Sequence, residues 1–153
     1  MFLFDRCSIH DDYIRVMTQD NKELLLKDLC ARLPYGVKIA LKNSEAYHHE
    51  NVAKKGDVTI DKLKGFNGSY FSIYHDNPLD WEWYVSDIDV EDIKPYLFPI
   101  SSMTEEQKVD MIKSSCGIGL DKNVFDWYNK NHFDYHGLIP MGLAKDATGL
   151  NIY

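Results

Sequence analysis

Histidines and carboxylates gather in three short segments that could hold a metal ion or move protons. They are His48-His49-Glu50, His75-Asp76, and residues 132–136, which read His-Phe-Asp-Tyr-His. A zinc site needs three or four such ligands to converge, commonly in a His-Glu-x-x-His helix or between cysteine pairs. Neither spacing occurs. We therefore predict no metal site and no cofactor, and interpret these histidines as surface groups, with Asp134 capping or pinning the tail.

An acidic run lies between the second and third of these segments, at Asp87, Asp89, Glu91 and Asp92. Such carboxylates could bind a divalent cation or act as an acid and base pair. The run lacks the glycine and the terminal glutamate of a calcium loop, so we interpret it as a solvated turn leading to a helix start. There is no Gly-x-Ser-x-Gly nucleophile motif, and we predict no catalytic residue.

Tyrosines on two neighbouring predicted strands are the candidate binding residues. Tyr70 and Tyr74 share one strand face, and Tyr84 lies with Glu82 on the polar face of the next strand. Together they would form an aromatic platform with nearby lysines, suited to contact with a protein or to stacking on a base. The alternative, that at least two of the three tyrosines fill a core beneath helices, stays open.

Charge and cysteine usage narrow the classes of partner. The chain has 153 residues and a net charge of −7, from 24 acidic and 17 basic side chains. Because nucleic-acid binding rests first on lysine and arginine, we expect no duplex DNA or RNA partner, whereas a small anionic ligand remains open.

Three widely spaced cysteines indicate reduced thiols, and no apolar run approaches a membrane span. We expect a cytoplasmic protein that does not bind membranes.

The first confident element is a helix over about residues 21–33. Asp20-Asn-Lys-Glu23 has the form of a capping box, and Pro34-Tyr-Gly36 ends the helix. We expect its inward face to carry Leu26, Leu29, Cys30 and Leu33.

Strand-like segments come next. Residues 37–41 alternate as a half-buried strand, 58–66 and 69–75 flank the hairpin signal Asn67-Gly68, and 81–86 alternates again. The hairpin register stays open: a two-residue loop pairs Lys64 with Phe71, and a three-residue loop pairs Leu63 with Phe71. We predict an antiparallel sheet of about four strands whose tryptophan face is covered by the first helix.

Residues 87–107 separate this part from a helical one. Pro95 and Pro99 bracket a bridge, and Thr104-Glu-Glu-Gln107 is a capping box for a helix to about residue 115. Asp121 can cap a third helix, a short helical turn is expected at 138–145, and 149–153 should fray. The prediction is a single α+β domain over 1–153: N-terminal helix, antiparallel sheet, C-terminal helices, with 1–19 as an extended arm.

Five segments carry a family resemblance. They are residues 22–37, 92–107, 125–127, 131–135 and 137–139, and they resemble an uncharacterised family of short proteins from phages, prophages and mobile elements of gut anaerobic bacteria. Pro140 departs from the charged residue expected there. The resemblance implies a phage or mobile-element origin, and it implies no particular activity, cofactor or catalytic residue.

The leading hypothesis is a non-enzymatic phage or mobile-element accessory protein. By analogy with small phage proteins, it would bind a host factor, a phage protein or a defence component, and a narrower version is sequestration of a nucleotide signal. Two rivals stay open. One is a small metal-dependent hydrolase using the His and Asp groups, and the other is a homo-oligomer assembled through an exposed strand edge.

Overall fold

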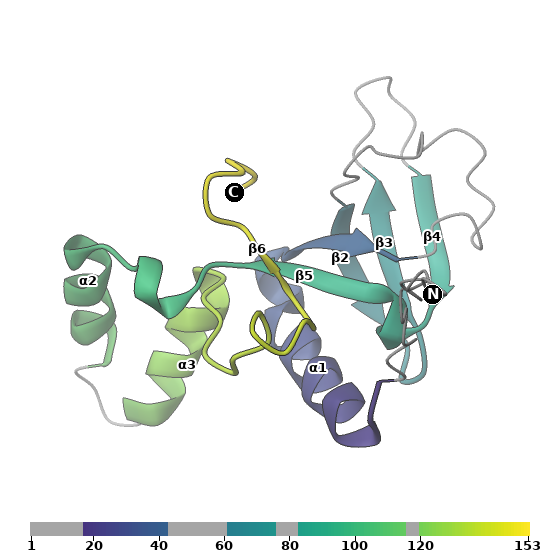
Figure 1. Ribbon diagram of the computed structural model, residues 1–153, viewed down its shortest axis with the longest axis horizontal. Coiled ribbons are helices and arrows are strands. Elements are labelled where there is room, and N and C mark those ends of the chain that lie inside the picture. Colours follow the sequence, from purple (N-terminus) through teal and green to yellow (C-terminus); the bar gives the residue numbers. More distant parts are fainter. Residues whose placement is uncertain (1–16, 43–60, 76–82, 116–119) are drawn as a thin grey trace, which may run out of the picture.

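The computed structural model describes residues 17–42, 61–75, 83–115 and 120–153, and these form an α+β fold. One helix comes first, a sheet of six short strands follows, and two helices stand between the fifth and sixth strands (Figure 1). The predicted fold class is confirmed, with more strands than expected. Most of the predicted arm, 1–19, lies outside the described residues.

Helix α1 spans Gln19–Arg32 and is capped two residues earlier than predicted. The Thr18 hydroxyl accepts a hydrogen bond from the Asn21 amide at 3.3 Å, and Asp20 lies inside the first turn. The expected capping box at 20–23 is therefore wrong, because the threonine two residues upstream supplies the cap oxygen. As predicted, the helix ends in a proline-containing 3-10 turn, η1 (Leu33–Tyr35), followed by Gly36 with φ +64°.

The buried face of α1 differs from the predicted apolar stripe. Its buried residues are Leu25, Asp28, Leu29 and Arg32. Of the predicted set, only Leu29 is fully buried, whereas Leu26, Cys30 and Leu33 pack at the edge of the core. The buried side of α1 is therefore rotated about the helix axis relative to the predicted side. It includes the charged residues Asp28 and Arg32 in place of the expected Leu26 and Leu33.

The sheet has the order β4-β3-β2-β1-β5-β6. Its first four strands are antiparallel neighbours, as predicted. Their bounds are β1 (Lys38–Leu41), β2 (Asp61–Phe66), β3 (Phe71–His75) and β4 (Trp83–Ile88).

The proline bridge of the sequence analysis is in fact a strand. After the 3-10 turn η3 (Val90–Asp92), β5 (Ile93–Leu97) pairs antiparallel with β1, with Pro95 opposite Ile39. A proline gives no amide to the ladder, which is why the sequence reads as a break. Likewise, the helical turn expected at 138–145 is replaced by turns and by β6 (Lys145–Asp146), which pairs parallel with β5.

The hairpin forms where Asn67-Gly68 predicts it, but with neither of the registers considered. Phe66 pairs with Phe71 and Leu63 with Ile73, so the loop has four residues and the register shifts between Leu63 and Gly65. The Asn67 side-chain oxygen accepts from the amides of Ser69 and Tyr70 at 3.0 and 2.8 Å. The bulge keeps both apolar pairs on one face, which a regular two- or three-residue loop could not do.

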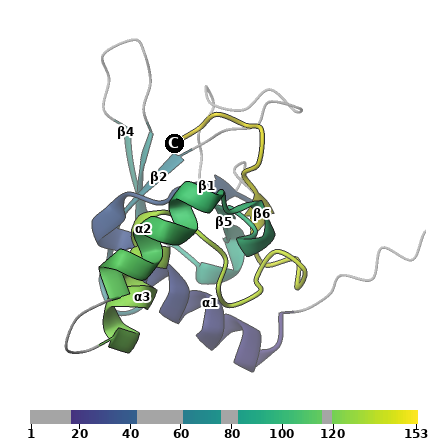
Figure 2. The same ribbon diagram turned by 90° about the vertical axis from the view of Figure 1, so that its left-hand side faces the viewer.

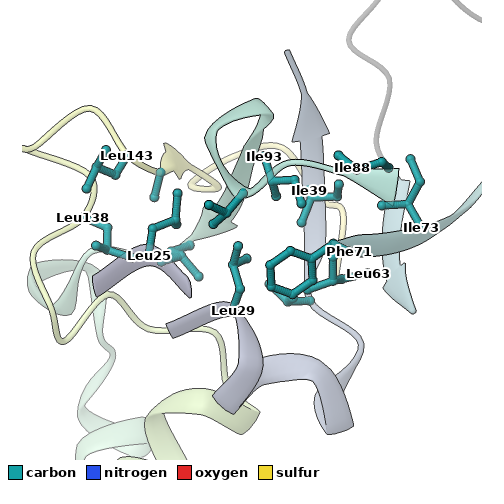
Figure 3. Close-up of a cluster of buried hydrophobic side chains, with 14 residues drawn as sticks. Leu25, Leu29, Ile39, Leu63, Phe71, Ile73, Ile88, Ile93, Leu138 and Leu143 are labelled. Atoms are coloured by element: carbon teal, nitrogen blue, oxygen red, sulfur yellow. The ribbon is translucent and has the colours of Figure 1, made fainter. Parts of the chain in front are cut away.

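The main core lies between α1 and one face of the sheet (Figure 3). Leu25 and Leu29 of α1 point toward strand residues such as Phe71, and Leu138 and Leu143 close one end from the C-terminal segment. The largest fully buried apolar side chains here include Leu25, Leu29, Ile39, Leu63, Phe71, Ile73, Ile88, Ile93 and Leu97.

Helices α2 (Glu105–Ser115) and α3 (Leu120–Lys130) form a pair beside the sheet (Figure 2). The capping box of α2 is confirmed: the Gln107 amide donates to the Thr104 hydroxyl at 3.2 Å, and the Thr104 amide donates to the Gln107 side chain at 2.8 Å. Since α3 begins at Leu120, Asp121 lies within the helix and not at its cap. Trp127 stacks on Phe133 and donates to Asp110, joining the pair to the tail.

The last residues are anchored and do not fray as expected. The Tyr153 hydroxyl accepts from the Lys38 amide at 2.9 Å and donates to the Tyr96 carbonyl at 2.8 Å. It bridges β1 and β5 where their regular pairing stops at Pro95. Ile152 packs against a small second cluster of Ala40, Tyr96 and Ala147.

Removing this hydroxyl gives a first prediction. Tyr153→Phe should lower the free energy of unfolding by about 1 kcal/mol, because two backbone groups lose their partner while the ring remains. Urea denaturation measures the change, and Tyr70→Phe in the exposed turn is the control, expected to stay near zero. Equal midpoints for the two variants would contradict a bridging role.

Candidate functional site

The two faces of the sheet have different surroundings. Leu63 and Ile73 are 2% exposed and face α1 in the main core, whereas the intervening Lys62 is exposed. Because neighbouring strand residues alternate between faces, the positions between the core residues define the opposite side. We call this side the outer sheet face; its register positions are Lys38, Lys62, Ser72, Tyr74, Tyr84 and Lys94.

A single row crosses four strands on the outer sheet face. Lys38 is opposite Lys62, Lys62 is opposite Tyr74, and Tyr74 is opposite Tyr84. Directly opposite residues of an antiparallel pair have Cβ atoms about 4.5–5.5 Å apart. The register therefore brings together two of the tyrosines that the sequence singled out and adds two lysines to them.

The other two predicted site residues do not join this row. Tyr70 lies in the hairpin turn just before β3 and is 41% exposed, and its carbonyl accepts a hydrogen bond from the Asn67 amide at 3.1 Å. Glu82 lies outside the described residues.

The two lysines were the part that the sequence analysis did not assign to the site. Lys38 belongs to β1, and Lys62 belongs to β2. Only the observed pairing of β1 with β2 shows that they are direct cross-strand partners. Like charges directly opposite each other on neighbouring strands are generally destabilising.

A second polar cluster lies inside the fold, where α1 meets the C-terminal segment. Arg32 and Asp28 have fully buried side chains and form a two-pronged ion pair, with Nε to Oδ2 at 2.8 Å and Nη2 to Oδ1 at 3.0 Å. Arg32 also donates to the Phe133 carbonyl at 2.8 Å, and its guanidinium lies 5.4 Å from the Tyr135 ring centroid. Nη1 makes a longer contact with the Tyr128 carbonyl, at 3.5 Å. Hydrogen bonds of this kind compensate for part of the cost of burying the charge.

His136 completes this cluster from the tail. Its Nδ1 lies 3.0 Å from Asp28 Oδ1, and its side chain is 20% exposed. Burial alone would raise the pKa of the Asp28 carboxyl, but hydrogen bonds from His136 and Arg32 together hold that pKa below its ordinary value. An ionised carboxylate only accepts hydrogen bonds, so Nδ1 of His136 carries the hydrogen in this contact.

This Asp-His pair resembles the orienting half of an acid-base site, in which a carboxylate fixes an imidazole. The other half would be a nucleophilic hydroxyl or thiol beside the ring. Cys30, on the same helix, has a pKa raised by burial, the opposite of an activated thiol. The contacts of the cluster are those of a structural network that ties α1 to the tail.

His132 lies in a different environment from His136. It is 7% exposed, stacks on Tyr153 with ring centroids 3.9 Å apart, and its Nδ1 has no hydrogen-bond partner among the described residues. Burial, with a smaller contribution from the Arg32 charge, lowers its pKa to about 4. His132 and His136 therefore serve separate contacts and were not brought together.

The remaining candidates from the sequence have structural contacts. Asp134 pins the tail as predicted, accepting from the Leu138 and Ile139 amides at 2.8 Å each. Glu91 of the acidic run pairs with Lys22 of α1 at 2.9 Å. Within 17–42, 61–75, 83–115 and 120–153, no group of three or more His, Cys, Asp or Glu residues could hold a metal ion. His48-His49-Glu50 and Asp76 lie outside these ranges.

No helix in these same ranges combines the length and apolar character needed to cross a bilayer. Comparison with protein-family models, with curated proteins and with solved structures finds no match to this chain.

Proposed function

We propose that this chain is a non-enzymatic accessory protein of a phage or mobile element that binds a host factor or defence component with its outer sheet face. The observation that carries the proposal is the row of Lys38, Lys62, Tyr74 and Tyr84 across β1 to β4. Tyrosine provides a large contact area at low rotamer cost, and flanking charges provide specificity. The phage setting rests on the family resemblance of residues 22–37, 92–107, 125–127, 131–135 and 137–139.

The location of the row supports binding as its role. The fold already has its main core on the other face of the sheet, formed with α1. The second cluster covers the outer side at Ala40 and Tyr96, near the tail, and Ser72 on the same side is buried as well. Lys62 remains exposed. This part of the face therefore presents a positive charge to a partner, although the chain as a whole has a net charge of −7.

The test is affinity capture from a lysate of a gut anaerobic bacterium, with retained proteins and retained small molecules both identified by mass spectrometry. The wild-type protein should retain at least one species whose retained amount falls about tenfold with Lys62→Glu. A tenfold loss of affinity corresponds to roughly 1.4 kcal/mol of binding free energy. Lys27→Glu, an exposed charge reversal on α1, is the matched control and should retain it fully. If all three proteins retain the same species in equal amounts, the outer sheet face is not the binding surface.

A further inference from the structure

The turn between β2 and β3 contains the only Asn-Gly pair in the sequence, at Asn67 and Gly68. Both residues are exposed. Gly68 has φ +98°, and no described atom beyond its chain neighbours lies within 4 Å of the place where a Cβ would be. Because glycine has no side chain to obstruct it, the Gly68 nitrogen can approach the preceding asparagine side chain more closely than the nitrogen of any other residue type.

Two backbone donors hold the side-chain carbonyl of Asn67. Its Oδ1 accepts hydrogen bonds from the Ser69 amide at 3.0 Å and from the Tyr70 amide at 2.8 Å. These bonds direct the side-chain amide forward along the chain, toward the peptide that follows Gly68. Amide donors on a carbonyl oxygen also stabilise the negative charge that develops there when its carbon is attacked. The turn therefore activates the Cγ atom of Asn67 toward a nucleophile.

Asn151 provides a comparison within the same molecule. It is exposed as well, and it has φ +51°. The next residue is Ile152, whose β-branched side chain crowds the backbone nitrogen beside it and packs against the cluster of Ala40, Tyr96 and Ala147. Exposure is thus shared by the two asparagines, whereas an unobstructed neighbouring nitrogen belongs to Asn67.

We propose that Asn67 is a self-modification site, which loses its side-chain amide without an enzyme. The Gly68 nitrogen gives its proton to a solvent base and attacks Cγ of Asn67, so that an N–Cγ bond forms and negative charge develops on Oδ1. The Cγ–Nδ2 bond then breaks. The departing nitrogen takes a proton from water and leaves as ammonia, and a succinimide ring remains. Water adds to either carbonyl of this ring and opens it to aspartate or to isoaspartate at position 67.

The two products should affect the hairpin differently. Aspartate keeps an oxygen in the place of Oδ1, and hydrogen bonds from amides to a carboxylate are stronger than those to a neutral carbonyl. Isoaspartate instead adds a carbon to the main chain, directly after the point where Phe66 pairs with Phe71. We therefore expect aspartate to preserve the turn and isoaspartate to weaken the pairing of β2 with β3.

The test follows the folded full chain during incubation at mildly alkaline pH. Peptide mapping by mass spectrometry measures amide loss at each asparagine, and chromatography separates aspartate from isoaspartate. Asn67 should lose its amide about tenfold faster than Asn151 or more, which corresponds to a difference of roughly 1.4 kcal/mol in activation free energy. The rate should rise with pH because the attacking nitrogen must lose its proton.

Two variants make the test specific. Asn67→Gln keeps the amide but adds a methylene, so that attack must close a larger ring, and its amide loss should be slower by about tenfold or more. Asn67→Asp represents one product, and its thermal midpoint at neutral pH should equal or exceed that of wild type. Thermal midpoints also verify that both variants are folded.

Three results would overturn the proposal. Equal rates of amide loss at Asn67 and Asn151 would show that the turn gives no advantage. A rate in Asn67→Gln equal to that of wild type would show that Gly68 is not the nucleophile. A midpoint of Asn67→Asp clearly below that of wild type would show that the two amide donors do not hold the product.

Discussion

Arg32→Met is expected to lower the free energy of unfolding by about 3–5 kcal/mol, the largest effect of any single substitution considered for this chain. The variant leaves the Asp28 carboxylate buried without its two-pronged partner and removes the donor to the Phe133 carbonyl. Breaking a buried pair costs this much because the remaining charge is uncompensated. Urea denaturation monitored by tryptophan fluorescence measures the loss.

Two companion proteins make the result specific to the ion pair. Lys27→Met, one exposed position before Asp28 on the same helix, should change stability by less than about 0.5 kcal/mol. The double variant Asp28→Leu with Arg32→Met leaves neither charge buried, so its loss should be smaller than the two single losses added together. An Arg32→Met loss below about 1 kcal/mol, or strict additivity, would contradict a buried, coupled pair.

Acidification is expected to destabilise the protein well above the range in which carboxylates titrate. The pKa of His132 is about 4 in the folded chain and near 6.5 when unfolded. Between these two values the unfolded chain binds more protons than the folded one, so stability falls as the pH is lowered through this window. The full loss by pH 4 is about 3 kcal/mol from this residue. Below pH 4, protonation of the Asp28 carboxyl, whose pKa is lowered in the folded chain, reduces the free energy of unfolding further.

The variant His132→Asn separates this histidine from the others. Residue 132 has φ +59°, a left-handed conformation that asparagine tolerates better than most residues, and asparagine does not titrate. Its absolute stability should be lower because the stack on Tyr153 is lost. The slope of stability against pH between 4 and 6.5 should become shallower than in wild type. A slope unchanged by the substitution would mean that His132 is readily protonated in the folded chain.

Elements governed by neighbouring residues were predictable from the sequence. The reciprocal bonds of Thr104 and Gln107 start α2 as expected, and Asn67-Gly68 places the hairpin turn. In each case the residues that decide the outcome lie within four positions of each other. Asp134 pinning the tail belongs to the same class, because its amide partners are four and five residues away.

Features decided by distant residues were not predictable. Pro95 reads as a break until β1 is available to pair with its strand. The row of the candidate site depends on a bulge that keeps Leu63 opposite Ile73, and the hydrophobic pattern alone was compatible with two other registers. Asp28 and Arg32 are four residues apart, the spacing of an ordinary exposed helix pair. The hydrogen bonds with the Phe133 carbonyl and His136 compensate for the cost of burying these two charges, and both partners lie more than 100 residues away in the chain.

The ion pair of α1 also limits when this chain can fold during synthesis. Asp28 and Arg32 leave the ribosome early, whereas the Phe133 carbonyl and His136 that complete their network follow 101 and 108 residues later. Until then, burying the helix would enclose two charges that lack part of their hydrogen bonding. We therefore expect closure of α1 onto the sheet to be a late, long-range step that follows synthesis of Phe133 and His136.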